Sequence, residues 1–137
     1  MKLVRFFAVF LLIAGISFAQ DTGQEKKIFK VAIDKDGIQR AEITGGEYFF
    51  EPYHIIVKIN MPVELTVRKK PGIVPHDIIV NAPEAGINFK EDLSKEPKVI
   101  KFTPKKTGKY PVYCSKKLLF FKSHRERGME GLLEVIE

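Results

Sequence analysis

The sequence predicts an all-β protein, an antiparallel β-sandwich. Apolar and polar residues alternate in short runs that are rich in β-branched side chains, which is the pattern of half-buried strands. Glycine, proline or asparagine ends most runs, as at the turn signals Asp36-Gly37 and Gly45-Gly46. No stretch after the N-terminal segment has the apolar period of a long helix. Many short strands at close spacing favour a sandwich over other architectures.

Eight strands are expected, at residues 28–34, 38–44, 54–60, 63–68, 76–81, 98–103, 110–114 and 131–136. Two other stretches, 89–94 and 116–127, are expected to hold a short turn of helix. Pro111 lies inside the 110–114 run. Since proline has no backbone donor, this strand is expected to lie at a sheet edge or to be bulged.

Residues 1–19 are predicted to be a secretory signal peptide. Lys2 and Arg5 precede the apolar run 6–16, and Ser17 and Ala19 are the small residues typical of a cleavage site, here before Gln20. The apolar run is short for a membrane span, and an uncleaved anchor is the alternative. Cleavage would leave residues 20–137 as a single domain without stable membrane insertion. We therefore expect an exported protein, with the periplasm as its compartment.

The mature chain is mildly basic. Removal of Lys2 and Arg5 with the leader lowers the formal net charge from +6 to +4. The basic residues are spread along the strands among acidic ones, so nucleic acid is not an expected partner. A modest positive field favours acidic protein partners or surfaces.

Cys114 is the only cysteine, so it cannot form an internal disulfide. It is an intermolecular cross-link, an inert buried thiol or a metal ligand. His124 and Met129 follow it before the last expected strand, and His76 opens a strand upstream. If the strands at His76 and Cys114 are antiparallel neighbours, all four side chains converge at one end of the sandwich. Two imidazoles, a thiolate and a weak axial thioether are a ligand set that suits copper.

The motifs around these residues resemble those of the cupredoxins, the family of plastocyanin and azurin. The run Gly108-x-Tyr110-x-x-Tyr113-Cys114-Ser115, followed by His124 and by Gly128-Met129-x-Gly131, is similar to the copper-binding end of that family. Upstream, Pro75-His76-Asp77 resembles the segment of its first histidine ligand. The resemblance covers about residues 46–137. It implies a Greek-key β-sandwich and one copper ion, cycling between Cu(I) and Cu(II), held by His76, Cys114, His124 and Met129.

Two features depart from the family pattern. Nine residues, 115–123, separate Cys114 from His124, a longer segment than is usual in the family. Its apolar residues 118–121 are flanked by basic ones and are expected either to dock a partner or to fold down as a lid. The second departure is Asp77, which stands where the family commonly has an asparagine that ties the ligand-bearing strands together.

The resemblance implies a one-electron carrier rather than an enzyme, because four protein ligands leave no open coordination position. Its expected partner is a redox protein, a cytochrome or an oxidase, met transiently by a monomer. The alternatives are copper sequestration or delivery, an altered red-type copper site with an open position, and an interaction module without metal. Glu47 and Glu51 are alternative fourth ligands.

Overall fold

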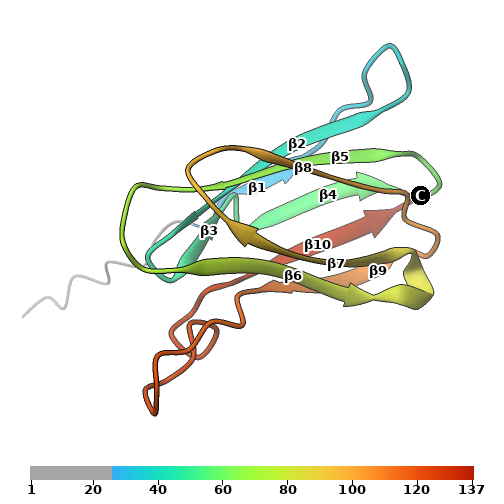
Figure 1. Cartoon of the computed structure of the whole chain (residues 1–137). Helices are drawn as coiled ribbons and strands as arrows, with labels where there is room; N and C mark the ends of the chain where they lie inside the picture. The colour runs from blue at the N-terminus through green and yellow to red at the C-terminus, as the bar shows by residue number, and fades with distance from the viewer. Residues whose placement is uncertain (1–25) are drawn as a thin grey trace, which may run out of the picture.

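The computed structural model describes residues 26–137, which form two β-sheets packed face to face (Figure 1). The predicted signal peptide lies outside the described residues. The strands are β1 (Ile28–Lys30), β2 (Gln39–Gly46), β3 (Phe49–Glu51), β4 (His54–Lys58), β5 (Val63–Lys69), β6 (His76–Ala82), β7 (Ile87–Leu93), β8 (Lys98–Phe102), β9 (Gly108–Tyr113) and β10 (Glu130–Ile136). One 3-10 turn, η1 (Pro83–Ala85), precedes β7. Among these residues there is no helix long and apolar enough to cross a bilayer.

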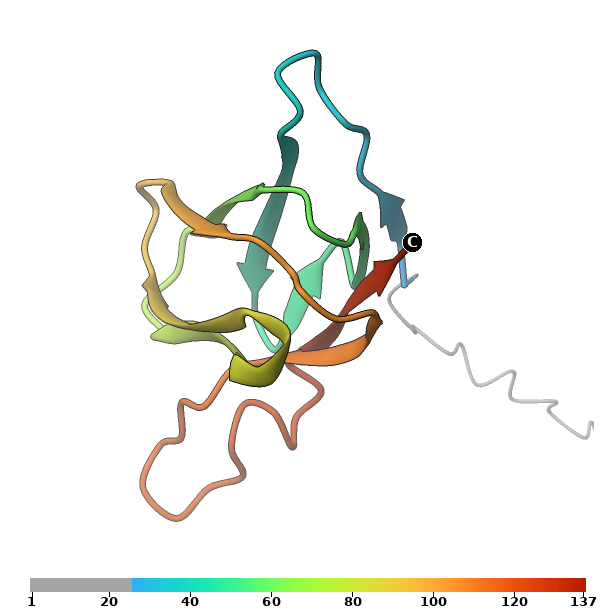
Figure 2. The same ribbon diagram turned by 90° about the vertical axis from the view of Figure 1, so that its right-hand side faces the viewer.

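The predicted β-sandwich is confirmed. One sheet has six strands in the order β1-β4-β10-β9-β6-β7, and the other has four in the order β3-β2-β5-β8. Figure 2 shows the two layers end-on, with the chain passing repeatedly from one layer to the other. These crossings make both sheets mixed rather than wholly antiparallel: β4 runs parallel to β1 and β10, and β2 runs parallel to β5. Parallel neighbours need such crossover connections, whereas hairpins make antiparallel ones.

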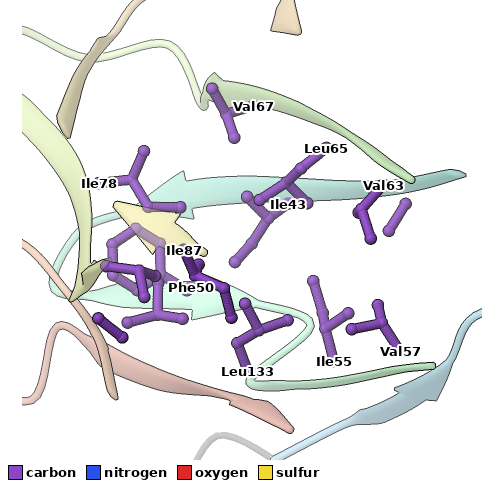
Figure 3. Close-up of a cluster of buried hydrophobic side chains, with 14 of the residues drawn as sticks. Ile43, Phe50, Ile55, Val57, Val63, Leu65, Val67, Ile78, Ile87 and Leu133 are labelled. Carbon is purple, nitrogen blue, oxygen red and sulfur yellow. The ribbon is translucent and has the colours of Figure 1, made fainter. Parts of the chain in front are cut away.

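The core lies between the two sheets and consists of alternate side chains of each strand. Val63, Leu65 and Val67 of β5 face inward from the smaller sheet, and Ile55 and Val57 of β4 meet them from the larger one (Figure 3). All five are at most 3% exposed. Burying a side chain of this size contributes about 1.5–3 kcal/mol, so the alternation read in the sequence is the main stabilising feature of the fold.

Both expected helical turns are wrong. Residues 89–94 fall almost entirely in β7, which pairs with β6 along its whole length, from His76 opposite Leu93 to Ala82 opposite Ile87. Ile87 and Leu93 are buried, and the residues between them alternate between partly buried and exposed. Pairing with β6 therefore decides the conformation of this charged stretch. Residues 116–127 contain turns and bends but no helix.

Two strands near the N-terminal side also differ from expectation. The run 28–34 forms regular strand only at β1, although the N–H of Val31 still donates to the carbonyl of Ile56 at 2.9 Å. Strand β3 was not predicted, because three residues are too few to show a period. It pairs antiparallel with the end of β2.

Pro111 lies in β9, an interior strand of the larger sheet, between β10 and β6. It lies opposite Leu132 of β10, while the ladder between β9 and β6 is confined to the pair Ile79 and Tyr113. The missing N–H of Pro111 therefore interrupts no ladder bond to β6. Proline is tolerated here although the strand does not lie at the expected sheet edge.

Candidate metal centre

The sheet topology brings the start of β6 and the end of β9 to the same end of the sandwich. His76 is the first residue of β6, and Cys114 directly follows β9. The two strands are antiparallel neighbours, with Ile79 opposite Tyr113. His124 lies on the connection from Cys114 to β10. Three of the four predicted ligands therefore meet by the route that the sequence suggested.

The ligand atoms of these three residues form a compact cluster. Nδ1 of His76 lies 3.1 Å from Nδ1 of His124, and Sγ of Cys114 lies 3.6 Å from the same His124 atom. All three ligand atoms lie within 4.8 Å of one another. Ligand atoms that share one ion at about 2 Å are about 3–4 Å apart. The cluster thus has the size of a site for a single ion.

Burial keeps both imidazoles neutral at pH 7. Each histidine is only 5% exposed. Loss of solvent lowers the pKa of His76 to about 4, with smaller contributions from the charge that His124 carries once it is protonated in acid and from Lys69. Loss of solvent also lowers the pKa of His124, with a smaller contribution from Arg127. A neutral imidazole offers a lone pair to a metal, so both rings are in the ligating state without further deprotonation.

Cys114 is fully buried, and its burial raises the pKa of the thiol to about 11. The backbone N–H groups of Asp77 and Lys116 act in the opposite direction, and the Asp77 N–H lies 3.5 Å from Sγ. Without a cation the group is therefore a thiol at pH 7. A bound metal ion would displace its proton and hold the thiolate.

Asp77 ties the two ligand-bearing segments together. Its side chain is fully buried. Oδ1 accepts a hydrogen bond from the Ser115 N–H at 2.6 Å, and Oδ2 accepts one from the Ser115 hydroxyl at 2.6 Å. By accepting these two hydrogen bonds, the carboxylate ties the two ligand-bearing segments together, as an asparagine at this position was expected to do. Asp77 directly follows His76 and is bonded to the residue that directly follows Cys114. Its negative charge favours the protonated imidazole of both histidines.

No protein-family model matches the sequence, and no curated protein matches it. Similar solved structures do exist. The metal-binding domain of the Cu(I)-exporting P-type ATPase CopA of Streptococcus pneumoniae D39 is 25% identical with a TM-score of 0.61, and the match covers 83% of this chain and 100% of that one. Reduced auracyanin of Roseiflexus castenholzii is 18% identical with a TM-score of 0.57, covering 72% and 97%. Auracyanin A of Chloroflexus aurantiacus, a "blue" copper protein, is 18% identical with a TM-score of 0.54, covering 73% and 100%. The chain has a cupredoxin-like fold.

Tyr48 borders the ligand residues of this cupredoxin-like protein, although the sequence analysis gave it no role there. Its ring stands edge-on to His124, with centroids 5.1 Å apart, and to His76 at 6.4 Å. Arg127 donates from Nη1 to the Tyr48 hydroxyl at 3.0 Å and lies over the ring at 4.8 Å. Tyr48 has a φ of +61°, an uncommon value for an aromatic residue. The only sequence signal was an aromatic residue beside the Gly45-Gly46 turn.

Met129 is bonded through its backbone to both neighbouring ligands of the cupredoxin-like site. Its N–H donates to the His124 carbonyl at 2.9 Å, and its carbonyl accepts from the Cys114 N–H at 3.2 Å. The side chain is fully buried. A Cβ placed on Gly45 would lie 3.3 Å from Met129 Cε, so the thioether side chain extends toward β2. Its role as axial ligand stays a prediction.

Of the two alternative fourth ligands, Glu47 lines the same cavity as His76, whereas Glu51 lies in β3. Glu51 pairs with Lys27 at 2.7 Å, and neither it nor the exposed Glu47 belongs to the metal cluster in the described part of the chain. His54, the third histidine, has Nε2 2.8 Å from Glu134 on the adjacent strand β10. It is the first residue of β4, within the strand that the sequence predicted at residues 54–60.

The segment 115–123 is anchored at its base and exposed at its tip. The His124 N–H donates to the Lys116 carbonyl at 2.9 Å, which closes the base. Figures 1 and 2 show this segment, in orange, extending away from the end of the sandwich. Its apolar residues are exposed, so the expectation of a lid folded over the cupredoxin-like site is not met. A cavity of about 300 Å³ lies beside His124, lined also by Tyr48, Ile73, Leu118 and Phe121.

Proposed function

We propose that this chain is an exported, mononuclear copper protein that carries one electron at a time between redox partners in the periplasm. The observation that carries the proposal is the buried cluster of His76 Nδ1, Cys114 Sγ and His124 Nδ1, all within 4.8 Å of one another. A trigonal His/His/Cys set favours copper over zinc, calcium or magnesium. Copper bound there would supply the Cu(I)/Cu(II) couple.

The contribution of the protein is to hold the ligands still. Backbone bonds fix Cys114 and His124 to the neighbouring chain, and Asp77 holds Ser115 against β6. Ligands fixed in this way need little rearrangement when the charge at the site changes. This property supports electron transfer and argues against bond-making catalysis, provided that Met129 completes the ligand set.

Exchange of electrons would take place at the His124 edge, because this residue lines the cavity at the exposed end of the site. The partner, a cytochrome or an oxidase, would meet a monomer of this protein through a small and transient contact. Lysines and arginines around the edge would steer an acidic partner, at a rate that falls as salt is added.

The test is the visible and electron paramagnetic resonance spectrum of the copper-loaded protein. We expect an intense thiolate-to-copper band. Cys114→Ser should remove the band while the β-sheet circular dichroism is unchanged, and Met129→Gln should keep the colour but shift the reduction potential. Retention of full colour in Cys114→Ser would overturn the proposal. A copper spectrum that changes on addition of azide would instead indicate an open, red-type site.

A second candidate function is copper sequestration or delivery. It is supported by the similarity to the metal-binding domain of a Cu(I)-exporting ATPase, and by the exposed segment 115–123, which links two ligands. The two functions differ in how firmly the metal is held. A carrier should be reduced and reoxidised without metal loss in the presence of a competing chelator, whereas a delivery protein should transfer Cu(I) to the chelator quickly.

A further inference from the structure

Four consecutive apolar side chains are exposed at the far end of the segment 115–123. We call them the apolar tip: Leu118, Leu119, Phe120 and Phe121. Their exposed fractions are 65%, 74%, 85% and 48%. Ile73, on the adjoining connection between β5 and β6, is 99% exposed and lines the same cavity as Leu118 and Phe121. Clustered exposed apolar groups of this kind mark an interaction site rather than ordinary surface.

The backbone presents these side chains outward. The Phe121 N–H donates to the Leu118 carbonyl at 3.0 Å, which closes a tight turn. Leu119, within this turn, has a φ of +48°, in the left-handed region that a leucine rarely adopts. The rings of Phe120 and Phe121 lie 5.1 Å apart at the end of the segment. The result is a tip that projects from the end of the sandwich (Figures 1 and 2).

Cationic side chains border the tip on both sides. Lys117 precedes it and Lys122 follows it. In the part of the chain that the structure describes, no carboxylate forms an ion pair with either lysine, whereas Lys116 is held by Asp92 at 2.7 Å. Glu126 is the one acidic residue between Cys114 and Met129, and it accepts from the N–H and hydroxyl of Ser123. The charge of Glu126 acts on both lysines beside the tip without forming an ion pair with them, so their ammonium groups can still contact an anionic surface.

We propose that the apolar tip docks on the surface of an anionic lipid bilayer. Leu119 and Phe120 would enter the acyl boundary, and Lys117 and Lys122 would contact phosphate headgroups. Apolar side chains flanked by lysines are the combination that gives reversible, interfacial binding. Docking in this way would place the His124 edge beside the membrane, within reach of a partner embedded there. The inference does not depend on which metal the site holds.

The binding test uses a chain that begins at Gln20, because it contains every described strand and the whole core but lacks the apolar leader. We expect it to sediment with vesicles of phosphatidylcholine mixed with an equal amount of phosphatidylglycerol, and much less with phosphatidylcholine alone. The double substitution Leu119→Ser/Phe120→Ser should lower the partition coefficient on the order of tenfold or more. Val99→Ser, which removes an exposed apolar side chain from β8, is the matched control and should leave partition unchanged.

The charge contribution is tested in the same assay. Lys117→Ala/Lys122→Ala should lower partition on the order of tenfold, since each lysine near an anionic surface contributes on the order of a fivefold factor. Lys105→Ala/Lys106→Ala makes the same change of net charge in the connection between β8 and β9, at the opposite end of the sandwich, and should have little effect.

A second readout reports insertion directly. The chain has no tryptophan, so Phe120→Trp introduces a single fluorophore at the tip. Its emission should shift to shorter wavelength with the anionic vesicles and be shielded from aqueous quenchers. The inference is overturned if the protein does not partition to anionic vesicles, or if the tip substitutions leave partition unchanged. Binding of the tip to an acidic soluble protein, without binding to vesicles, would equally overturn it and identify a protein partner instead.

Discussion

At the metal centre, one buried carboxylate connects the chain after His76 to the chain after Cys114. Asp77 accepts two hydrogen bonds from Ser115 and is fully buried. Asp77→Asn should preserve the connection, because the amide oxygen accepts from the Ser115 N–H and the amide nitrogen donates to the hydroxyl. It removes a negative charge near the site, which favours Cu(I). We expect the reduction potential to rise by on the order of tens of millivolts, measured by electrochemistry.

Two further variants separate the charge of Asp77 from its structural role. Asp92→Asn removes a carboxylate that is 70% exposed and pairs with Lys116, so it should hardly move the potential. Asp77→Ala leaves the Ser115 N–H without its partner and should lower the free energy of unfolding of the copper-free protein by about 1–3 kcal/mol, measured by urea denaturation. An unchanged or lower potential in Asp77→Asn would contradict the expected effect of its charge on the copper.

The protonation states of the three ligands predict the proton release on metal binding. At pH 7 both imidazoles are neutral, because their pKa values are lowered, to about 4 for His76, while the Cys114 thiol, with a pKa of about 11, carries its proton. Binding of one copper ion should therefore release on the order of one proton. Calorimetric titration in buffers of different ionisation enthalpy measures this number.

The same reasoning gives the pH dependence of this release. Above about pH 11 the thiol is already ionised, so release should vanish. Below about pH 4 the imidazole of His76 is protonated, so binding must displace a further proton and the apparent affinity should fall more steeply. Cys114→Ser is the control and should release no proton at pH 7. Release of two or more protons at pH 7 would mean that a histidine is charged in the copper-free protein.

Among the single strands, β2 has a glycine, Gly45, at the point where the side chain of Met129, the predicted axial ligand, packs against it. A Cβ at Gly45 would lie 2.7 Å from Leu93 Cδ1 and 3.3 Å from Met129 Cε. Gly45→Ala should therefore force these side chains to move and lower the free energy of unfolding by about 1–3 kcal/mol. If Met129 is the axial ligand, the same variant should also alter the copper spectrum. Gly72→Ala, where a Cβ would meet nothing within 4 Å, is the matched control and should have almost no effect.

Strand alternation was enough to predict the sandwich, but not which strands pair. The inward residues of β5 were visible as a period. Parallel pairing of β4 with β10 depends instead on crossover connections that no local pattern reveals. The charged run in β7 looked helical, because only its pairing with β6 makes it a strand. Local propensity is a weak guide wherever tertiary pairing decides the conformation.

The candidate site shows the same division between what was and was not predictable. The sequence was enough to predict that His76, Cys114 and His124 converge, because it shows both the ligand residue types and the positions of the strand ends. The acceptor role of Asp77 and the contact of Tyr48 with both imidazoles could not. These depend on side-chain directions and on the positive φ at Tyr48, which only the assembled structure defines.

For the molecule as a whole, the position of the core predicts how the fold responds to metal removal. The buried apolar cluster extends from Met129 and Leu93 at the metal end to Val57 and Val135 between the same two sheets. Most of it consists of side chains that do not ligate. We therefore expect the copper-free protein to keep its β-sheet circular dichroism and to unfold in one cooperative thermal transition, unlike small zinc domains that fold only with metal.

Copper should then stabilise the protein by mass action alone, by about 2.7 kcal/mol at a free concentration one hundred times the dissociation constant. Two variants separate the metal from the core. Cys114→Ser should melt close to the copper-free protein, and added copper should raise its melting temperature far less. Val57→Ala, at the end of the sandwich remote from the ligands, should lower the melting temperature of both forms by a similar amount, since it opens a cavity that costs about 1–3 kcal/mol whether or not metal is bound. A copper-free protein without a cooperative transition would contradict this account and show that folding requires the metal. Such a requirement would favour a permanently bound copper ion over copper that the protein delivers to another molecule.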